Sequence, residues 1–189
     1  MSNNVRRILS NPWKLSVWLS VASLAGLAIA TGYAVSQGID SESAQVARGK
    51  YLVDLGGCGH CHTPGYFFGR PDAARFLGGS DLGHEVPGLG TFVAPNLTPD
   101  NDTGLGTWTK DEIVTAIRTG VRPDGRILAP IMPWRGYASL TKSDAAAIVE
   151  YLRSLPPVTN KVPGPFGPEE KPPMFRMTIL PPGPGAQPN

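Results

Sequence analysis

The hydrophobic residues of this chain fall into one long uncharged run near the N-terminus and several shorter periodic groups after it. From Leu15 to Val35 no residue carries a charge, and Leu, Val and Ala dominate. A helix of this length would measure about 32 Å, enough to cross a hydrocarbon core of about 30 Å. The run predicts a membrane-spanning helix, with residues 1–36 as cytoplasmic N-terminus and anchor and residues 37–43 as a polar linker.

The charges on either side of the run indicate its orientation. Three cations precede it within residues 1–14, and the first charges after it are Asp40 and Glu42. By the positive-inside rule, the rest of the chain lies on the outer side of the membrane. A cleaved signal peptide is the alternative, because residues 28–30 (Ala-Ile-Ala) resemble a cleavage site, although the apolar run is longer than in most signal peptides. Both interpretations export the rest of the chain.

Three later groups of hydrophobic positions have the period of an α-helix. Residues 44–55 carry Gly49 on their apolar face, which predicts the close approach of another helix. Residues 109–120 begin with a capping box, Thr-Lys-Asp-Glu, and end at a glycine. Residues 141–155 place Tyr151 where it would pack across that first glycine. These groups predict an all-α domain.

Between and after the helices the chain is rich in Gly and Pro. Residues 63–107 show little periodicity, and a structureless loop of that length is uncommon in a compact domain. A bound prosthetic group would explain it, because apolar side chains of the loop would pack on that group. Residues 158–189 are too rich in Pro for a helix or a central strand. They form either a disordered tail or an extended arm that docks on a partner subunit.

The candidate chemistry lies in one pentapeptide, Cys58-Gly59-His60-Cys61-His62. This is the C-x-x-C-H pattern of covalent haem attachment. The two thiols would form thioethers to the vinyl groups of one haem, and His62 is close enough to bind the iron axially. A redox dithiol would need a βαβ context and a structural zinc site would need more Cys or His. Cys58 and Cys61 are the only cysteines in the chain, which favours one covalent haem c.

Two stretches resemble a known family. Residues 48–52 (Arg-Gly-Lys-Tyr-Leu), followed by the haem motif, resemble the start of a class I c-type cytochrome. Residues 94–108, which begin Ala-Pro-Asn-Leu-Thr-Pro-Asp, closely resemble the cytochrome c subunits of membrane-bound bacterial alcohol, aldehyde and gluconate dehydrogenases. The resemblance covers residues 44–157 and implies an all-α class I haem domain with long loops.

The resemblance also implies roles for residues of the second stretch. The carbonyl of Pro95 would accept the Nδ1 proton of His62, which fixes the ring and makes the imidazole a better ligand. Trp108 would turn its indole N–H to a haem propionate, with core packing as the alternative. Asn96 is assigned to the same cofactor-binding set.

The predicted sixth ligand is Met132, which lies between two prolines in residues 128–134. In the resembled family this methionine gives its sulfur to the iron, and a His/Met pair raises the reduction potential. A gap-filling core methionine is the alternative. Arg126 would pair with a propionate or lie on the solvated surface, and the same holds for Arg122. His84 is the free candidate for a second axial histidine.

Composition limits the remaining choices. The net charge is +2, and no basic stripe with interleaved aromatics favours nucleic acid. We expect a membrane-anchored monohaem cytochrome on the periplasmic side of a bacterial cytoplasmic membrane, in contact with lipid. It would carry single electrons between redox partner proteins such as dehydrogenase or oxidase subunits, without catalytic residues of its own. The alternative is a haem enzyme or gas sensor with an open sixth position, and a third possibility is a chiefly structural subunit.

Overall fold

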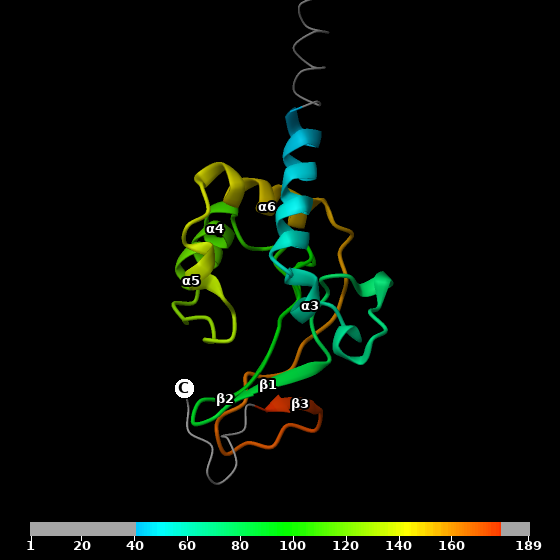
Figure 1. Ribbon diagram of the computed structural model, residues 1–189, viewed down its shortest axis with the longest axis vertical. Coiled ribbons are helices and arrows are strands. Elements are labelled where there is room, and N and C mark those ends of the chain that lie inside the picture. The colour runs from blue at the N-terminus through cyan, green and yellow to red at the C-terminus, as the bar shows by residue number, and fades with distance from the viewer. Residues whose placement is uncertain (1–40, 179–189) are drawn as a thin grey trace, which may run out of the picture. The chain divides into compact units, whose positions relative to one another are not determined.

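The computed structural model describes residues 41–178 (Figure 1). It begins with a helix over residues 41–55, which leads into the C-x-x-C-H helix. The remaining elements follow in chain order as α3 (Cys58–His62), η1 (Tyr66–Phe68), η2 (Ala73–Arg75), β1 (Leu82–Val86), β2 (Gly90–Val93), α4 (Lys110–Thr119), α5 (Trp134–Tyr137), α6 (Lys142–Ser154) and β3 (Phe175–Thr178).

The first helix crosses α6 at Gly49. A Cβ atom at Gly49 would lie 1.9 Å from the carbonyl oxygen of Ala147 and 2.7 Å from the Cβ of Tyr151. Only glycine permits this approach, so the close contact predicted at this glycine is present. Arg48 and Asp144 form an ion pair of 2.9 Å between the same two helices. The buried core around this crossing consists of Val53, Leu77, Ile113, Ile148, Val149, Tyr151 and Leu152.

Helices α4 and α6 begin and end where their sequences predict. The side-chain oxygen of Thr109 accepts the backbone N–H of Glu112, whose carboxylate accepts the N–H of Thr109, which completes the capping box. Gly120 ends α4 with a φ of 75°, a conformation that costs glycine little. Thr141 caps α6 through its side-chain oxygen, which accepts the backbone N–H of Asp144.

The prediction of an all-α domain is wrong, because the described residues include a three-stranded sheet in the order β2-β1-β3. Strands β1 and β2 form an antiparallel hairpin, and β3 pairs with β1 in parallel. The first half of β1 is buried on both faces, and Gly83 approaches Thr91 so closely that a Cβ would lie 2.5 Å from its methyl group. A strand without a solvent face shows no alternation, so periodicity could not reveal it.

The segment after α6 is more than an extended tail. Phe166 exchanges two backbone hydrogen bonds with Thr91, of 2.9 and 3.0 Å, and the chain then forms β3 as an exposed edge strand. We call residues 158–178 the arm, and Figure 1 shows it returning from α6 to the sheet. An edge strand is compatible with nearby prolines, because only one side of its backbone is paired.

The predicted transmembrane helix is not found in the described part of the chain. No helix within residues 41–178 is long and apolar enough to cross a membrane. The run from residue 15 to residue 35, for which the sequence predicts such a helix, lies outside the described residues.

Candidate haem-binding site

The two thiols lie on one short helix. Helix α3 begins after Gly57, whose φ is 66°, and ends at the extended residue Thr63. Cys58 and Cys61 are three residues apart and therefore share a helix face, and both are free thiols. Burial raises the pKa of Cys58 to about 11 and also raises that of Cys61. Both sulfurs are thus protonated thiols at pH 7.

His62 is the buried end of this helix. It is 5% exposed, and its Nδ1 lies 2.7 Å from the carbonyl oxygen of Pro95. A carbonyl only accepts, so Nδ1 carries the proton and Nε2 keeps its lone pair. Burial lowers the pKa of His62 to about 4, and this exceeds the opposing effect of the Pro95 hydrogen bond. The ring is therefore neutral at pH 7, in the tautomer that a metal ligand needs.

The loop that carries Pro95 is held by Asn96, which is 1% exposed. The Asn96 amide donates to the carbonyl of Val158 (2.6 Å) and to the hydroxyl of Thr103 (3.0 Å). Its oxygen accepts the backbone N–H of Thr98 at 2.9 Å. Asn96 thus fastens the loop to the C-terminal arm, and its side-chain bonds are to protein groups.

Two further polar residues, which the sequence did not identify, also bind the arm to the rest of the domain. Thr98 is fully buried, and its hydroxyl accepts the N–H of Val158 at 3.0 Å. Asn160 donates its amide to the carbonyl of Gly78 at 2.8 Å. The partners are about 60 to 80 positions apart in the chain, so no local pattern identifies them.

Met132 lies in a turn before α5. Its N–H donates to the carbonyl of Ala129 at 2.9 Å, and its own carbonyl accepts the N–H of Trp134 at 2.8 Å. The residue is half-buried and outside regular secondary structure. Met174 and Met177, by contrast, lie at the sheet, where Met177 pairs with His84.

The other predicted haem contacts have protein partners. The guanidinium of Arg122 lies 5.0 Å from the centre of the Trp108 ring, and the Trp108 carbonyl accepts Arg153. Arg126 is 47% exposed, and its side chain lies 3.9 Å from Asp124. Trp108 also packs against the hydrophobic core.

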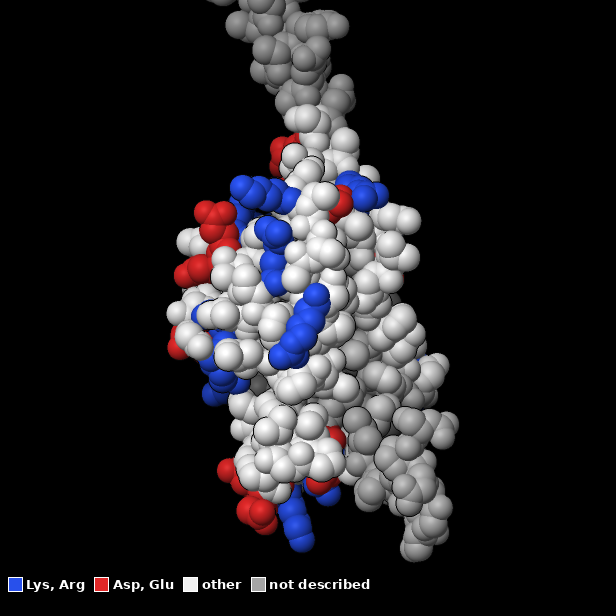
Figure 2. All heavy atoms as spheres, turned by 60° about the vertical axis from the view of Figure 1, so that its left-hand side comes forward, with Lys and Arg blue, Asp and Glu red and all other residues white. Residues whose placement is uncertain are grey.

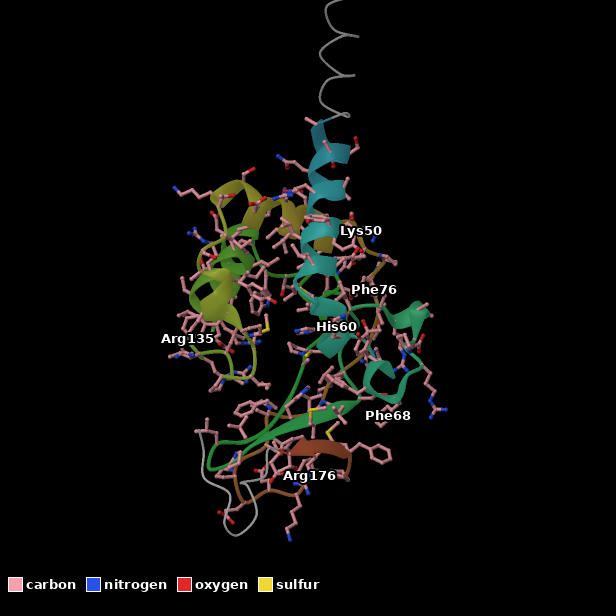
Figure 3. The ribbon with its side chains drawn as sticks, viewed as in Figure 1. Lys50, His60, Phe68, Phe76, Arg135 and Arg176 are labelled. Atoms are coloured by element: carbon pink, nitrogen blue, oxygen red, sulfur yellow. The ribbon has the colours of Figure 1, made fainter. Side chains whose placement is uncertain are left out.

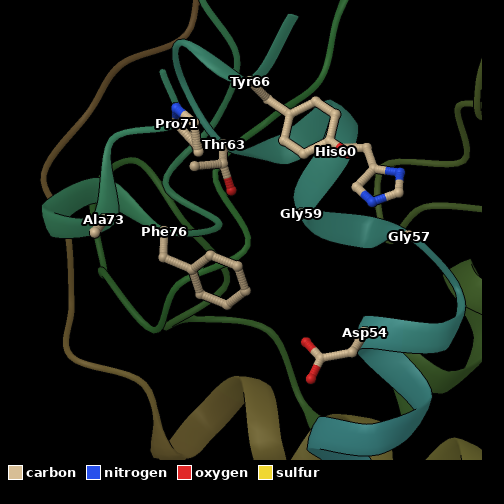
Figure 4. A pocket seen from close by; sticks show the side chains of 9 residues that line it. All are labelled: Asp54, Gly57, Gly59, His60, Thr63, Tyr66, Pro71, Ala73 and Phe76. Atoms are coloured by element: carbon tan, nitrogen blue, oxygen red, sulfur yellow. The ribbon is translucent and has the colours of Figure 1, made fainter. Parts of the chain in front are cut away.

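The two remaining histidines differ in their surroundings. His84 is buried in β1, with the ring of Phe67 at 5.5 Å, and burial lowers its pKa. His60 is an exposed residue of α3 (Figure 3). Its ring stacks on that of Tyr66, with 4.4 Å between the ring centres. It borders a cavity of about 340 Å³ that also includes Phe76 (Figure 4). Cys58, Cys61 and His62 do not line that cavity, which is therefore separate from the predicted ligands.

The donor set fits a covalently attached haem. It supplies two reduced thiols on one helical turn and a neutral imidazole whose Nδ1 is already bound. In residues 41–178, no group of three or more His, Cys, Asp or Glu side chains would hold a metal ion. The zinc alternative thus lacks ligands within the described part of the chain.

Comparison with known proteins agrees with this chemistry. The family model "Cytochrome c" matches residues 46–156. The chain is 34% identical over 139 residues to the "Alcohol dehydrogenase (quinone), cytochrome c subunit" of Gluconacetobacter polyoxogenes, covering 74% of this chain and 27% of the relative. It is 35% identical over 120 residues to a "Diheme cytochrome c-type" protein of Cereibacter sphaeroides, covering 61% of this chain and 38% of that protein.

A third relative is the "Gluconate 2-dehydrogenase cytochrome c subunit" of Pantoea cypripedii, 35% identical over 112 residues, which cover 59% of this chain and 23% of the relative. The chain thus spans between about a fifth and two fifths of these relatives. The family resemblance inferred from the sequence is confirmed, since relatives of this chain are described as cytochrome c subunits of dehydrogenases. Because the cytochrome c family model matches more than half of the chain, the chain belongs to the cytochrome c family.

Proposed function

We propose that this chain carries single electrons through one haem c, held covalently by Cys58 and Cys61 with His62 and Met132 as axial ligands. The observation that carries the proposal is the buried, neutral His62 ring with its Nδ1 bound to Pro95. One C-x-x-C-H motif and two cysteines support a single haem.

The residues of the chain prepare this site. The Pro95 hydrogen bond orients the His62 ring and increases its basicity toward a metal. Two backbone hydrogen bonds hold the turn at Met132, to the carbonyl of Ala129 at 2.9 Å and from the N–H of Trp134 at 2.8 Å. The Met132 thioether is a soft, neutral ligand. The haem, when bound, supplies a one-electron ferric–ferrous couple, whose potential a His/Met pair raises. Filled axial positions favour electron transfer over substrate binding.

The partner in this proposal is a dehydrogenase. It is supported by relatives whose names describe cytochrome subunits of alcohol, fructose and gluconate dehydrogenases. Figure 2 shows Lys and Arg interspersed with Asp and Glu on the face that comes forward there. Surface charges of both signs favour recognition by local complementarity over a uniform field.

The location in this proposal is the outer side of a bacterial cytoplasmic membrane. Its support is the sequence of residues 1–36, with cations before an uncharged run. Fractionation of cells, followed by protease treatment of spheroplasts, tests it. Membrane-bound haem protein that protease removes supports this location, whereas a protease-resistant cytoplasmic pool contradicts it.

Optical spectra of the purified holoprotein test the site. Wild type should show the weak ferric band near the red end of the spectrum that reports sulfur bound to iron, and Met132→Ala should abolish it. Met177→Ala is the matched control and should keep the band. If His84→Ala, and not Met132→Ala, changes the ferric spectrum, the sixth ligand is His84. High-spin wild-type haem that binds carbon monoxide at once would overturn the carrier proposal in favour of an enzyme or sensor.

A further inference from the structure

One hydrogen bond joins the segment of Met132 to the part of the chain that carries the two cysteines. The hydroxyl of Tyr137 donates to the carbonyl oxygen of Gly56 at 2.8 Å, across 81 positions of the sequence. Gly56 lies where the first helix ends, two residues before Cys58. The last carbonyls of a helix have no donor within that helix, so the Tyr137 hydroxyl supplies a donor that the helix cannot.

Tyr137 is also close to one of the attachment residues. A Cβ atom at Gly56 would lie 3.4 Å from the Tyr137 hydroxyl oxygen and 3.7 Å from the sulfur of Cys58. These two atoms therefore border the same point of the backbone. Tyr137 is half-buried, and burial raises the pKa of its hydroxyl above the ordinary value. The hydroxyl thus stays protonated at pH 7 and remains a donor.

Helix α5 connects this hydrogen bond to Met132. It begins at Trp134, whose N–H donates to the Met132 carbonyl at 2.8 Å, and Tyr137 is its last residue. In Figure 1, α5 lies to the left of α3. Among the hydrogen bonds of the described residues, the Tyr137 bond is the only one between residues 128–140 and residues 44–62. It is therefore the polar link between the segments of the two predicted axial ligands.

We propose that Tyr137 is a positioning residue that keeps Met132 bound to the iron, because its hydrogen bond ties the segment of the sixth ligand to the segment of Cys58. The inference rests on the proposed function. Imidazole is a ligand suited to iron, whereas a thioether is softer, so the protein favours Met132 by holding it nearby. Loss of the tie shifts the equilibrium toward a form in which Met132 has left the iron. A ligand that binds only this form then binds more tightly.

The test compares Tyr137→Phe with the matched control Tyr151→Phe in the full-length ferric holoprotein. Each variant removes one hydroxyl and keeps the ring, and Tyr151 lies in α6 at the crossing with the first helix. Titration with imidazole, followed by loss of the ferric band that reports sulfur, measures how readily Met132 leaves the iron. For Tyr137→Phe we expect imidazole affinity to rise about fivefold, as loss of one hydrogen bond of ordinary strength implies. Tyr151→Phe should bind imidazole as wild type does.

A second measurement needs no variant. In wild type the backbone N–H of Leu140 donates to the carbonyl of Tyr137 at 3.0 Å, and the N–H of Leu97 donates to the carbonyl of Leu77 at 2.9 Å. Saturation with imidazole should speed the exchange of the Leu140 N–H with solvent, because α5 is released together with Met132. The Leu97 N–H, on the side of His62, should exchange as slowly as before.

Any one of three results would overturn the proposal. The first is an unchanged imidazole affinity in Tyr137→Phe, even with a lower free energy of unfolding, since the bond would then be merely structural. The second is an equal rise in both variants, and the third is unchanged exchange at Leu140 with imidazole bound. The exchange measurement decides the question even if Tyr137→Phe fails to mature. Wild-type ferric protein without the sulfur band would instead contradict the proposed function, because Met132 would not be a ligand.

Discussion

The helices around the C-x-x-C-H motif and the sheet with its arm are stabilised in different ways. At the helix crossing, Gly49 brings two backbones into contact beside a buried apolar core. The sheet includes an edge strand, β3, whose four residues are all exposed, with Phe175 at 71%. Between them lies the loop of Pro95, which the buried amide of Asn96 fastens to the arm. The comparison shows that the first part of the arm supports His62, while its last part mainly extends the sheet.

The largest effect should come from filling the helix crossing. In Gly49→Leu the new side chain would enter space held by the backbone of Ala147. Backbone atoms cannot move aside as a flexible side chain can, so we expect the free energy of unfolding to fall by about 3 kcal/mol or more. Denaturant unfolding of the holoprotein measures the change.

Gly136→Ala is the matched control for this prediction. Gly136 also lies in a helix, and nothing lies within 4 Å of a Cβ placed there. Alanine has the higher helix propensity, so stability should be unchanged or slightly increased. Equal losses in the two variants would mean that the crossing of the two helices is not specially close.

A smaller loss of unfolding free energy should follow removal of the Asn96 amide, which joins the loop of Pro95 to the arm. Asn96→Ala leaves the N–H of Thr98 without its acceptor, and it leaves the carbonyl of Val158 with only the longer bond of 3.5 Å from the Thr98 hydroxyl. Unsatisfied buried polar groups should lower the free energy of unfolding by about 2 kcal/mol. Asn101→Ala, at an exposed position of the same loop, is the control, and a similar loss there would argue against a special role for Asn96.

The same comparison explains what the sequence could predict. The capping box at Thr109, the stop at Gly120 and the close approach at Gly49 depend on local residue types with one physical meaning each, and all three are present. The sheet was missed because β1 is partly buried on both faces and β3 is paired from about 90 residues away. The bonds of Asn96 were missed for the same reason. Local patterns specify helices well, whereas non-local pairing leaves little trace in a single sequence.

Removal of β3 should have a modest effect and would separate the two halves of the arm. A chain that ends at Pro172 keeps the bonds of Val158 and Asn160 but loses the parallel pairing with β1. Because β3 is an exposed edge strand, we expect a loss of about 1 kcal/mol in unfolding free energy. The ferric and ferrous spectra should stay unchanged, and an altered spectrum would show that the whole arm supports the haem site.

The smallest effect should be at the ion pair on the surface of the helix crossing, and it should depend on pH. Hydrogen bonding from Arg48, helped by Thr141, lowers the pKa of Asp144 below its ordinary value. A carboxylate whose pKa is lowered by folding adds stability above the unfolded-state pKa, and this contribution disappears as the pH falls through the folded-state pKa. Asp144→Asn should thus be slightly less stable than wild type at pH 7 and equal to it in acid. High salt should reduce the difference, since the pair is solvent-exposed. A difference that persists in acid would mean that Asp144 stabilises the crossing through packing, as Gly49 does, and not through its charge.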